Sequence, residues 1–310
     1  MDLRQLRYFA KVVELGNVTR ASEALHIAQP AVSQQMRALE RDLGMQLLTR
    51  SVQGVMPTPA GRTLYRHALG LLMEADRTRE LLRQDAEEPE GRVSVAMPSS
   101  TARLMAMPLA RRIRDRHPGI TLELIEAPTV DLPQLIDSGR VALAVMADAD
   151  RSRSTVVQSL LTEELYLVAW PEFPLEADVV SLSRLAQMPL VMPSAPNTIR
   201  RRVEWALREE GVEWNVLFEA SSTALLFAAV LERLGVTILP WSAAYLEIEQ
   251  RKLKIARVDH PLFARELSLC WKESGLISNA VLKVKTTMLE LFQEYGSRPG
   301  WTHAPSDCVP

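Results

Sequence analysis

Apolar residues recur at helical spacing between residues 25 and 43. Val32, Met36, Leu39 and Leu43 follow one another at steps of four, three and four, which predicts the buried stripe of an amphipathic helix. Pro30 suits the first turn of such a helix, because the N–H that proline lacks would be unpaired there. Taken alone, the pattern also fits an ordinary surface helix.

The polar face of this helix carries amides and guanidinium groups. No acidic residue occurs between Ala24 and Leu39. Glutamine can bond adenine at two atoms, arginine can bond guanine in the same way, and serine can reach a base or a phosphate. This chemistry suits the reading of base edges in DNA.

The neighbouring segments favour a DNA-binding arrangement over a plain surface helix. Apolar positions between residues 3 and 13 predict a first helix that stops at Gly16, and Asn17 can cap a second, short helix. The predicted order along the chain is therefore a helix, a short helix, a turn and a helix with a polar face. This is the order of elements in a helix-turn-helix domain. In the next segment, residues 47–58, apolar and polar residues alternate and a turn is expected at Gly54. This pattern predicts a β-wing that carries Arg50 towards a phosphate.

A long helix is predicted after the wing, from Pro59 to about residue 88, with Thr58 as its capping hydroxyl. About 30 residues at ~1.5 Å each would give a rod of roughly 45 Å. Its apolar or small positions alternate steps of four and three, as in a coiled-coil seam. That stripe needs a partner, which is either the body of the same chain or the same helix of a second subunit. The seam positions are Leu64, Ala68, Leu71, Ala75, Thr78 and Leu82, and the five apolar ones are expected at the dimer contact.

From Arg92 onward the pattern changes to alternating strands and helices, which predicts an α/β body of parallel sheets with right-handed crossovers. The order restarts near residue 164, so two subdomains are expected within 91–296: subdomain I at about 91–162 and 267–296, and subdomain II at about 163–266. Predicted strands cover 92–97, 120–127, 141–147, 164–170, 190–192, 216–220, 236–240 and 267–271. The tail at 297–310 is rich in Gly, Pro and polar residues and is predicted to be flexible.

Three of the predicted strand-to-helix junctions are rich in Ser, Thr and Asn. Ligands of open parallel sheets bind beyond the carboxyl ends of the strands, where helix N-termini favour an anion. The same residue types are ordinary helix caps, which is the better explanation of any single junction. Three together favour a ligand cleft between the subdomains. The junction residues expected at a ligand are Ser99, Ser100, Thr101, Ser194, Thr198 and Ser222.

Composition and charge narrow the class of protein. The 310 residues, 47% hydrophobic and 24% charged, are typical of a soluble protein of two or more domains. The net charge of −2 is unevenly spread: residues 1–85 hold 12 Lys and Arg against 9 Asp and Glu, and the rest holds 24 against 29. A basic head on an acidic body fits a protein that touches DNA at one end. Without a long apolar run or a signal-peptide core, no membrane partner and a cytoplasmic location are expected.

Neither a catalytic nor a metal-binding motif is found, and no cofactor is expected. The chain lacks G-x-S-x-G, H-E-x-x-H and a phosphate-binding loop, and its five histidines are scattered. Two cysteines, Cys270 and Cys308, are too few for a disulfide framework or a thiolate metal site. A periplasmic-type binding protein would share the α/β body but should carry a signal peptide and no helix-turn-helix. A small-molecule enzyme with a DNA-binding head would need a catalytic constellation.

One part of the chain resembles the LysR-type family of bacterial transcriptional regulators, namely LRYFAKVVELGNVTRASEALHIAQPAVSQQMRALERDLGMQLLTR followed by PTPAGRTLY. Within that family, HIAQPAVSQQ and LLTRSVQGVMPTPAG resemble the nitrogen-assimilation-control branch. The specific match covers the first quarter of the chain, and the remainder is similar only in its layout of strands and helices. Gln34 stands where the family often has Arg, so the operator sequence stays open.

The resemblance implies an N-terminal winged helix-turn-helix at 1–57, a long linker and dimerisation helix at 58–88, and a periplasmic-binding-protein-like, two-subdomain α/β effector domain at 91–296. It also implies a homodimer, often paired into a homotetramer, on an interrupted inverted repeat in double-stranded promoter DNA. The residues expected at DNA are Gln29, Pro30, Ser33, Gln34, Arg37, Arg50 and Thr58.

The family places its ligand in the cleft, and Ser99, Ser100, Thr101 and Thr129 fall at the matching turns. Two alternatives stay open for the body. In one, a small anionic metabolite modulates the regulator. In the other, the regulator needs no effector, and its C-terminal domain serves only oligomerisation and contact with RNA polymerase.

Overall fold

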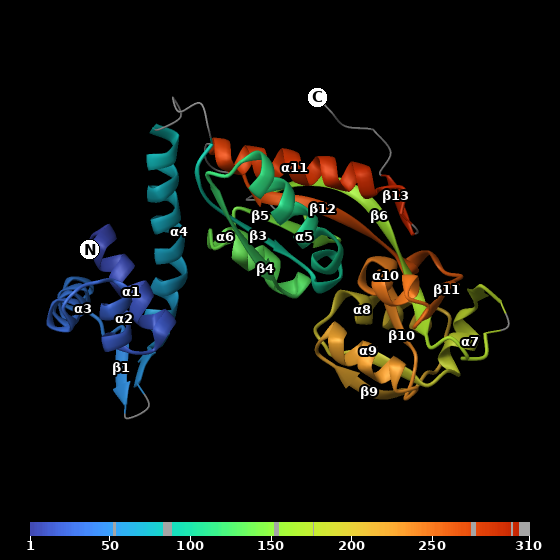
Figure 1. Ribbon diagram of the computed structural model, residues 1–310. Helices are drawn as coiled ribbons and strands as arrows, with labels where there is room; N and C mark the ends of the chain where they lie inside the picture. Colours follow the sequence, from blue (N-terminus) through green and yellow to red (C-terminus); the bar gives the residue numbers. More distant parts are fainter. Residues whose placement is uncertain are drawn as a thin grey trace. The chain divides into compact units, whose positions relative to one another are not determined.

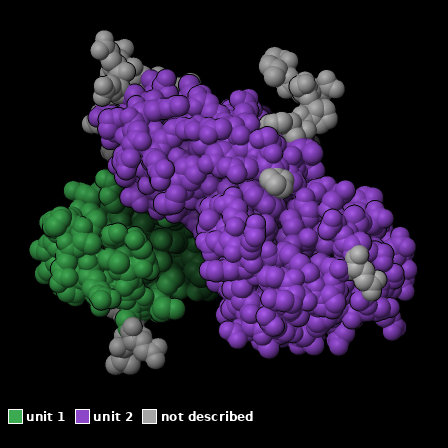
Figure 2. Space-filling view, turned by 45° about the vertical axis from the view of Figure 1, so that its right-hand side comes forward, with its two compact units in different colours: residues 1–85, 137–140 green, residues 86–136, 141–310 purple. Residues whose placement is uncertain are grey.

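The computed structural model describes residues 1–51, 54–82, 89–151, 155–175, 177–273, 277–298 and 300–303. The chain folds as two compact units, each with its own hydrophobic core. Unit 1 holds residues 1–85 and 137–140, and unit 2 holds 86–136 and 141–310 (Figure 2).

Unit 1 is a small helical bundle with a two-stranded wing. Phe9, Val12, Val32 and Leu39 are fully buried in its core, so the apolar stripes of the sequence meet as expected. The capping chemistry is local, since Asn17 accepts hydrogen bonds from the backbone N–H groups of residues 19 and 20. Its elements are α1 (Leu3–Leu15), α2 (Val18–Ala24), α3 (Gln29–Leu43), β1 (Leu48–Ser51), β2 (Gly54–Pro57) and α4 (Pro59–Leu82).

The long helix α4 packs on α1 within unit 1, so part of its predicted coiled-coil seam is already buried inside the same chain. Ala68 is completely buried against Leu6 and Ala10, and Leu64 packs against the same cluster. Ala68 is therefore not available to a second subunit. Leu71 keeps 48% of its surface exposed and Ala75 is half-buried. The side chain of Leu82 lies outside the described residues.

Subdomain I of unit 2 is a sheet covered by helices on both faces. Strand β3 (Gly91–Met97) runs parallel to β4 (Ile120–Glu126) and β5 (Leu143–Ala147). Helices α5 (Ser99–Arg116) and α11 (Asn279–Tyr295) pack on one face, whereas α6 (Leu132–Asp137), preceded by the short helix η1 (Thr129–Asp131), packs on the other (Figure 1).

Subdomain II has a separate core, in which Leu190, Val203, Leu207, Val230 and Ile238 are fully buried. Strands β8 and β9 form a parallel pair, while β10 and β11 join the longer sheet. Its elements are β7 (Val179–Val180), α7 (Leu182–Ala186), β8 (Leu190–Pro193), α8 (Thr198–Glu209), β9 (Val216–Ala220), α9 (Thr223–Leu231), β10 (Thr237–Pro240), α10 (Trp241–Glu249), β11 (Lys254–Val258) and η2 (Pro261–Phe263).

Two crossover strands join the subdomains and make the sheet mixed rather than parallel throughout. Strand β6 (Thr155–Ala169) starts nine residues before the predicted 164–170, and β12 (Ala264–Lys272) runs antiparallel to both β5 and β6. The expectation of purely parallel sheets was wrong. The chain enters subdomain II along one strand and returns along its neighbour, so these two strands must run in opposite directions.

The C-terminal segment is ordered in part, which corrects the prediction of a flexible tail at 297–310. Trp301–His303 forms strand β13, antiparallel to β6 (Figure 1). Trp301 is buried in the core of subdomain I, stacked on Phe292. Burial of one large aromatic side chain and a buried partner for its N–H outweigh the disorder that Gly, Pro and polar composition predicts. Residues 304–310 lie outside the described part.

Candidate nucleic-acid interface and ligand cavity

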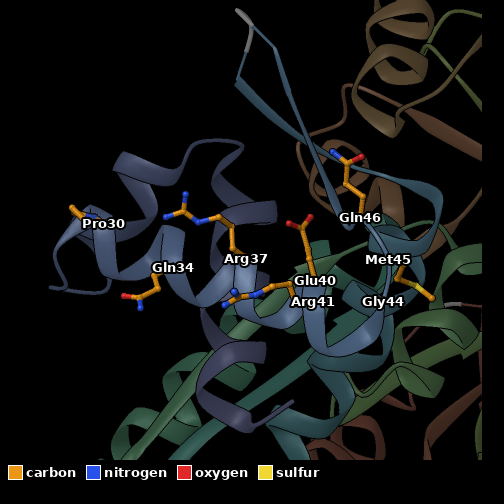
Figure 3. Close-up of a pocket in the computed structure, with 8 residues that line it drawn as sticks. All are labelled: Pro30, Gln34, Arg37, Glu40, Arg41, Gly44, Met45 and Gln46. Atoms are coloured by element: carbon orange, nitrogen blue, oxygen red, sulfur yellow. The ribbon is translucent and has the colours of Figure 1, made fainter.

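One exposed face of α3 carries three of the side chains that the sequence placed at DNA, namely Pro30, Gln34 and Arg37. Pro30, Gln34, Arg37 and Arg41 follow one another at steps of four, three and four, so they share one side of the helix, and all four are exposed. Figure 3 shows them along an open groove that continues into the turn after α3 at Gly44, Met45 and Gln46. Arg41 was not among the predicted site residues, although the same spacing identifies it.

Glu40, the acidic residue among those that line this groove, accepts hydrogen bonds from the backbone. One carboxylate oxygen of Glu40 accepts hydrogen bonds from the N–H groups of Leu47, at 2.8 Å, and Leu48, at 3.1 Å, and so ties the end of α3 to the wing. Among the described residues, Arg37 and Arg41 have no ion-pair partner. The exposed face of α3 therefore presents unpaired positive charge, which suits a phosphate backbone or a guanine edge.

Ser33 does not belong to the exposed face. It is only 7% exposed and lies beside the buried residues Val32 and Met36. Its hydroxyl accepts a hydrogen bond of 3.2 Å from the side-chain amide of Gln29. The expectation that Ser33 contacts a base is corrected accordingly: its hydroxyl orients the Gln29 amide, which is the exposed group.

Thr58 has a structural bond where a DNA contact was expected. Its hydroxyl donates to the carbonyl oxygen of Gln46 at 2.8 Å and accepts from the N–H of Gly61 at 3.0 Å, which caps α4. A hydroxyl has one proton, and a phosphate oxygen can only accept, so this side chain cannot also donate to DNA. Arg50 lies opposite Val55 in the wing, and its side chain is outside the described residues.

A cavity of about 210 Å³ opens in unit 2 between the subdomains. It is smaller than the ~300–1,000 Å³ of pockets for drug-sized ligands, so it suits a small metabolite. The three junctions meet here as predicted, through α5, α8 and α9. Of the predicted residues, Ser99, Ser100, Thr129, Thr198 and Ser222 line the cavity.

The cap explanation holds for two of the junctions. Asn197 accepts from the N–H groups of Ile199 and Arg200, and Ser222 accepts from the N–H of Leu225 at 3.3 Å. In contrast, α5 has no side-chain cap, because Pro98 occupies the cap position. The hydroxyls of Ser99 and Ser100 are therefore not used in capping α5.

Two predicted ligand residues, Ser194 and Thr101, do not line the cavity. The backbone N–H of Ser194 donates to the carbonyl oxygen of Ala220 at 3.0 Å, directly after the last residue of β8. Thr101 is completely buried, and its hydroxyl oxygen has no hydrogen-bond partner among the described residues. The helix begins at Ser99 rather than at Thr101, and Thr101 shares the buried side of α5 with Leu104 and Met105.

Replacing Thr101 with valine is expected to raise the free energy of unfolding by about 1 kcal/mol, because the change removes a buried, unbonded hydroxyl and nearly keeps the shape. All six tryptophans lie in unit 2, so denaturant titration followed by tryptophan fluorescence measures this unit. Thr287→Val is the matched control: that buried hydroxyl donates to the Lys283 carbonyl at 2.8 Å, so its loss should destabilise. A Thr101→Val protein that is as destabilised as Thr287→Val would contradict this assignment.

Arg265 is a cavity residue that the sequence analysis missed. This arginine on β12 is 3% exposed and forms an ion pair with the fully buried Glu163 of β6. Its Nε and Nη2 lie 2.8 and 2.6 Å from one Glu163 oxygen, and Nη2 also donates to the Ser100 hydroxyl at 2.9 Å. The described residues supply no partner for Nη1. The cavity therefore combines serine hydroxyls with a guanidinium group whose charge Glu163 compensates.

The described residues offer little chemistry for catalysis. Burial, with the nearby Glu266, raises the pKa of the Cys270 thiol to about 12, so it is not a thiolate at neutral pH. Across the described ranges, no three His, Cys, Asp or Glu side chains gather as a metal site. Within the same ranges, none of the helices has the length and apolarity needed to cross a membrane.

Two family models cover most of the chain. Residues 3–62 match the bacterial regulatory helix-turn-helix protein, lysR family, and residues 86–293 match the LysR substrate binding domain. The first match contains α1 to α3 and the wing, and the second contains subdomain II, the cavity and subdomain I up to residue 293 in α11.

Relatives and solved structures agree with these matches. The nitrogen assimilation regulatory protein Nac of Klebsiella aerogenes is 34% identical, over 94% of this chain and 95% of that protein. A full-length variant of OxyR from Pseudomonas aeruginosa has the same fold, with a TM-score of 0.75 and 20% identity over 98% of this chain and 99% of that one. Full-length CbnR, solved in complex with its target DNA, has a TM-score of 0.68 and 23% identity over 95% and 99%. The chain therefore belongs to the LysR family of bacterial helix-turn-helix proteins and is a DNA-binding transcriptional regulator of the Nac-like branch, not an enzyme.

Proposed function

We propose that the protein binds an interrupted inverted repeat in promoter DNA as a homodimer, with α3 of each chain in the major groove of one half-site. The observation that carries this proposal is the exposed Pro30–Gln34–Arg37–Arg41 face, whose two arginines have no ion-pair partner among the described residues. A two-fold dimer presents two such faces, which suits a two-fold DNA site.

The side chains divide into two roles. Gln29 and Gln34, from the first half of α3, and Arg37, at its middle, reach base edges. Arg41 and the wing residue Arg50 contact phosphates, and Pro30 packs at the start of the helix. Ser33 and Thr58 act indirectly, through the bonds that orient Gln29 and anchor α4.

Arg37→Ala is expected to weaken binding to the preferred site by about 1–3 kcal/mol if the guanidinium holds a guanine. The preferred site comes first from sequencing the DNA fragments that the pure protein retains at moderate salt. Arg208→Ala, which removes the same charge from the exposed face of α8 in unit 2, is the control. An even loss across all sequences with a shallower salt dependence assigns Arg37 to a phosphate. If both the affinity for the preferred site and the salt dependence are unchanged, the proposal that α3 binds DNA is contradicted.

The protein assembles through α4, and pairing of dimers into a tetramer bends the promoter between the bound sites. Leu71 carries the exposed apolar surface for this contact. A regulator of bacterial promoters works in the cytoplasm, where the chromosome lies, and meets RNA polymerase there.

We further propose that the cavity binds a small acid that modulates the regulator. Serine hydroxyls, the N–H groups at the start of α5 and the Nη1 edge of Arg265 offer hydrogen-bond donors to a carboxylate or phosphate. Thermal shift against a panel of small metabolic acids tests this part, because a ligand of the folded state raises the unfolding midpoint. A protein that responds to none of them favours the alternative, a regulator without an effector.

A further inference from the structure

The C-terminal strand lies where β6 leaves one subdomain for the other. On one side, β6 pairs with β12 up to Glu164, and from Leu165 onward it pairs with β10 and β11 of subdomain II. Strand β13 pairs with residues 161–163 of β6, and the carbonyl oxygen of Gly300 accepts from the N–H of Glu164 at 2.7 Å. The strand therefore begins at the hinge and runs from there along β6 into subdomain I.

Gly300 makes this docking specific. Its backbone lies at φ +73°, and a Cβ there would be 2.7 Å from both the ring and the hydroxyl oxygen of Tyr166. Tyr166 is held in place, since its hydroxyl donates to Glu164 at 2.6 Å. Only glycine lets the backbone lie against this ring without displacing it.

Trp301 connects the strand to the buried ion pair. Its ring stacks on Phe292, with ring centres 5.7 Å apart, and its indole N–H donates to one Glu163 oxygen at 2.9 Å. The Ser242 hydroxyl donates to the same oxygen. The other Glu163 oxygen accepts from Arg265, which bonds Ser100 in the cavity lining. An unbroken chain of bonds thus runs from β13 to the cavity.

We propose that Trp301 is a positioning residue for the cavity: through Glu163 it fixes the guanidinium of Arg265 against Ser100 at the start of α5. The carboxylate is completely buried, so no solvent replaces the indole N–H when it is removed. With only the Ser242 donor left on that oxygen, the carboxylate can turn and the guanidinium turns with it. The effect on a bound ligand rests on the function proposed above, whereas the effect on Arg265 does not.

Hydrogen exchange of the full-length protein without ligand tests the positioning role. Trp301→Phe keeps the stacked ring and removes the N–H, so it should speed exchange about tenfold or more at the start of α5 and at the start of β12. Thr302→Val changes an exposed side chain on the same strand and should leave both segments unchanged. Gly300→Ala, which displaces the strand, should reproduce the Trp301→Phe pattern. Faster exchange confined to β13 and α11, or equal in Thr302→Val, would overturn the proposal.

Inorganic phosphate serves as the probe for the ligand arm, with its dissociation constant taken from the rise in the unfolding midpoint. Trp301→Phe should raise that constant about tenfold relative to the wild type, and Thr302→Val should not. Equal phosphate binding in the wild type and Trp301→Phe would overturn the proposal. A wild type that does not bind phosphate counts against the ligand part of the proposed function, and the exchange arm still decides the role of Trp301.

Discussion

Arg265→Met is expected to lower the free energy of unfolding of unit 2 by about 3–5 kcal/mol, because it leaves the Glu163 carboxylate buried without its cation. Glu163 would retain only the Ser242 and Trp301 donors, both on the same oxygen. Methionine fills much of the volume of the arginine stem, so loss of packing contributes less than loss of charge. Denaturant titration followed by tryptophan fluorescence measures the effect, since all six tryptophans belong to unit 2.

The double variant Glu163→Gln/Arg265→Met is the control for this prediction. It removes both charges, keeps a side chain of nearly the same shape at Glu163 and retains acceptor capacity for Ser242 and Trp301. It should recover most of the loss, because a missing pair costs far less than a single uncompensated charge. A single variant that loses less than about 1 kcal/mol would mean that water reaches the pair, as at a surface ion pair.

Leu71→Asp is expected to dissociate the dimer and to lower operator affinity by about a hundredfold or more. Leu71 is the exposed apolar residue of the seam, and a carboxylate there cannot be buried against a second helix without a partner. Two DNA-binding units linked in a dimer bind the two half-sites of an operator far more tightly than one unit binds a single half-site. Loss of the dimer therefore removes this increase in affinity. Sedimentation measures the first effect, and binding to the selected DNA measures the second.

Thr63→Asp adds the same charge to α4 about 100° around the helix from Leu64, at an exposed position, and should remain dimeric. A Leu71→Asp protein that sediments as the wild type would place Leu71 outside the interface. A monomeric variant that binds DNA with unchanged affinity would contradict the proposal that a dimer binds two half-sites.

Much of unit 1 follows from near neighbours in the chain. The stripe of Val32, Met36 and Leu39 predicted α3, its buried face and the exposed polar face opposite, because helical spacing is a property of consecutive residues. Local capping was also predictable, as Asn17 and Gly16 show. The LysR resemblance carried the rest of the assignment, since its residues lie in this same segment.

Side-chain direction at the edge of a face depended on tertiary structure. Helical spacing placed Ser33 with the polar residues, but the packing of α3 leaves it 7% exposed, and the Thr58 hydroxyl is taken by Gln46, twelve residues away. Thr101 faces the core because it shares one side of α5 with the buried residues Leu104 and Met105, and only the packing of α5 on the sheet showed that this side is buried.

The sequence by itself determined the helix-turn-helix, the α/β character of the body and the three Ser- and Thr-rich junctions that meet at the cavity, because each is encoded by residues within a few positions of one another. Only the tertiary structure decided that Arg265, Glu163 and Trp301 form one buried network, since these residues are 102 and 138 positions apart along the chain. A charged residue in a strand and a tryptophan in a Gly- and Pro-rich tail carry no local sign of burial. Their burial is favourable because distant partners compensate the two charges and bond the indole N–H, and those partners are in place only when β6, β12 and β13 come together at the hinge.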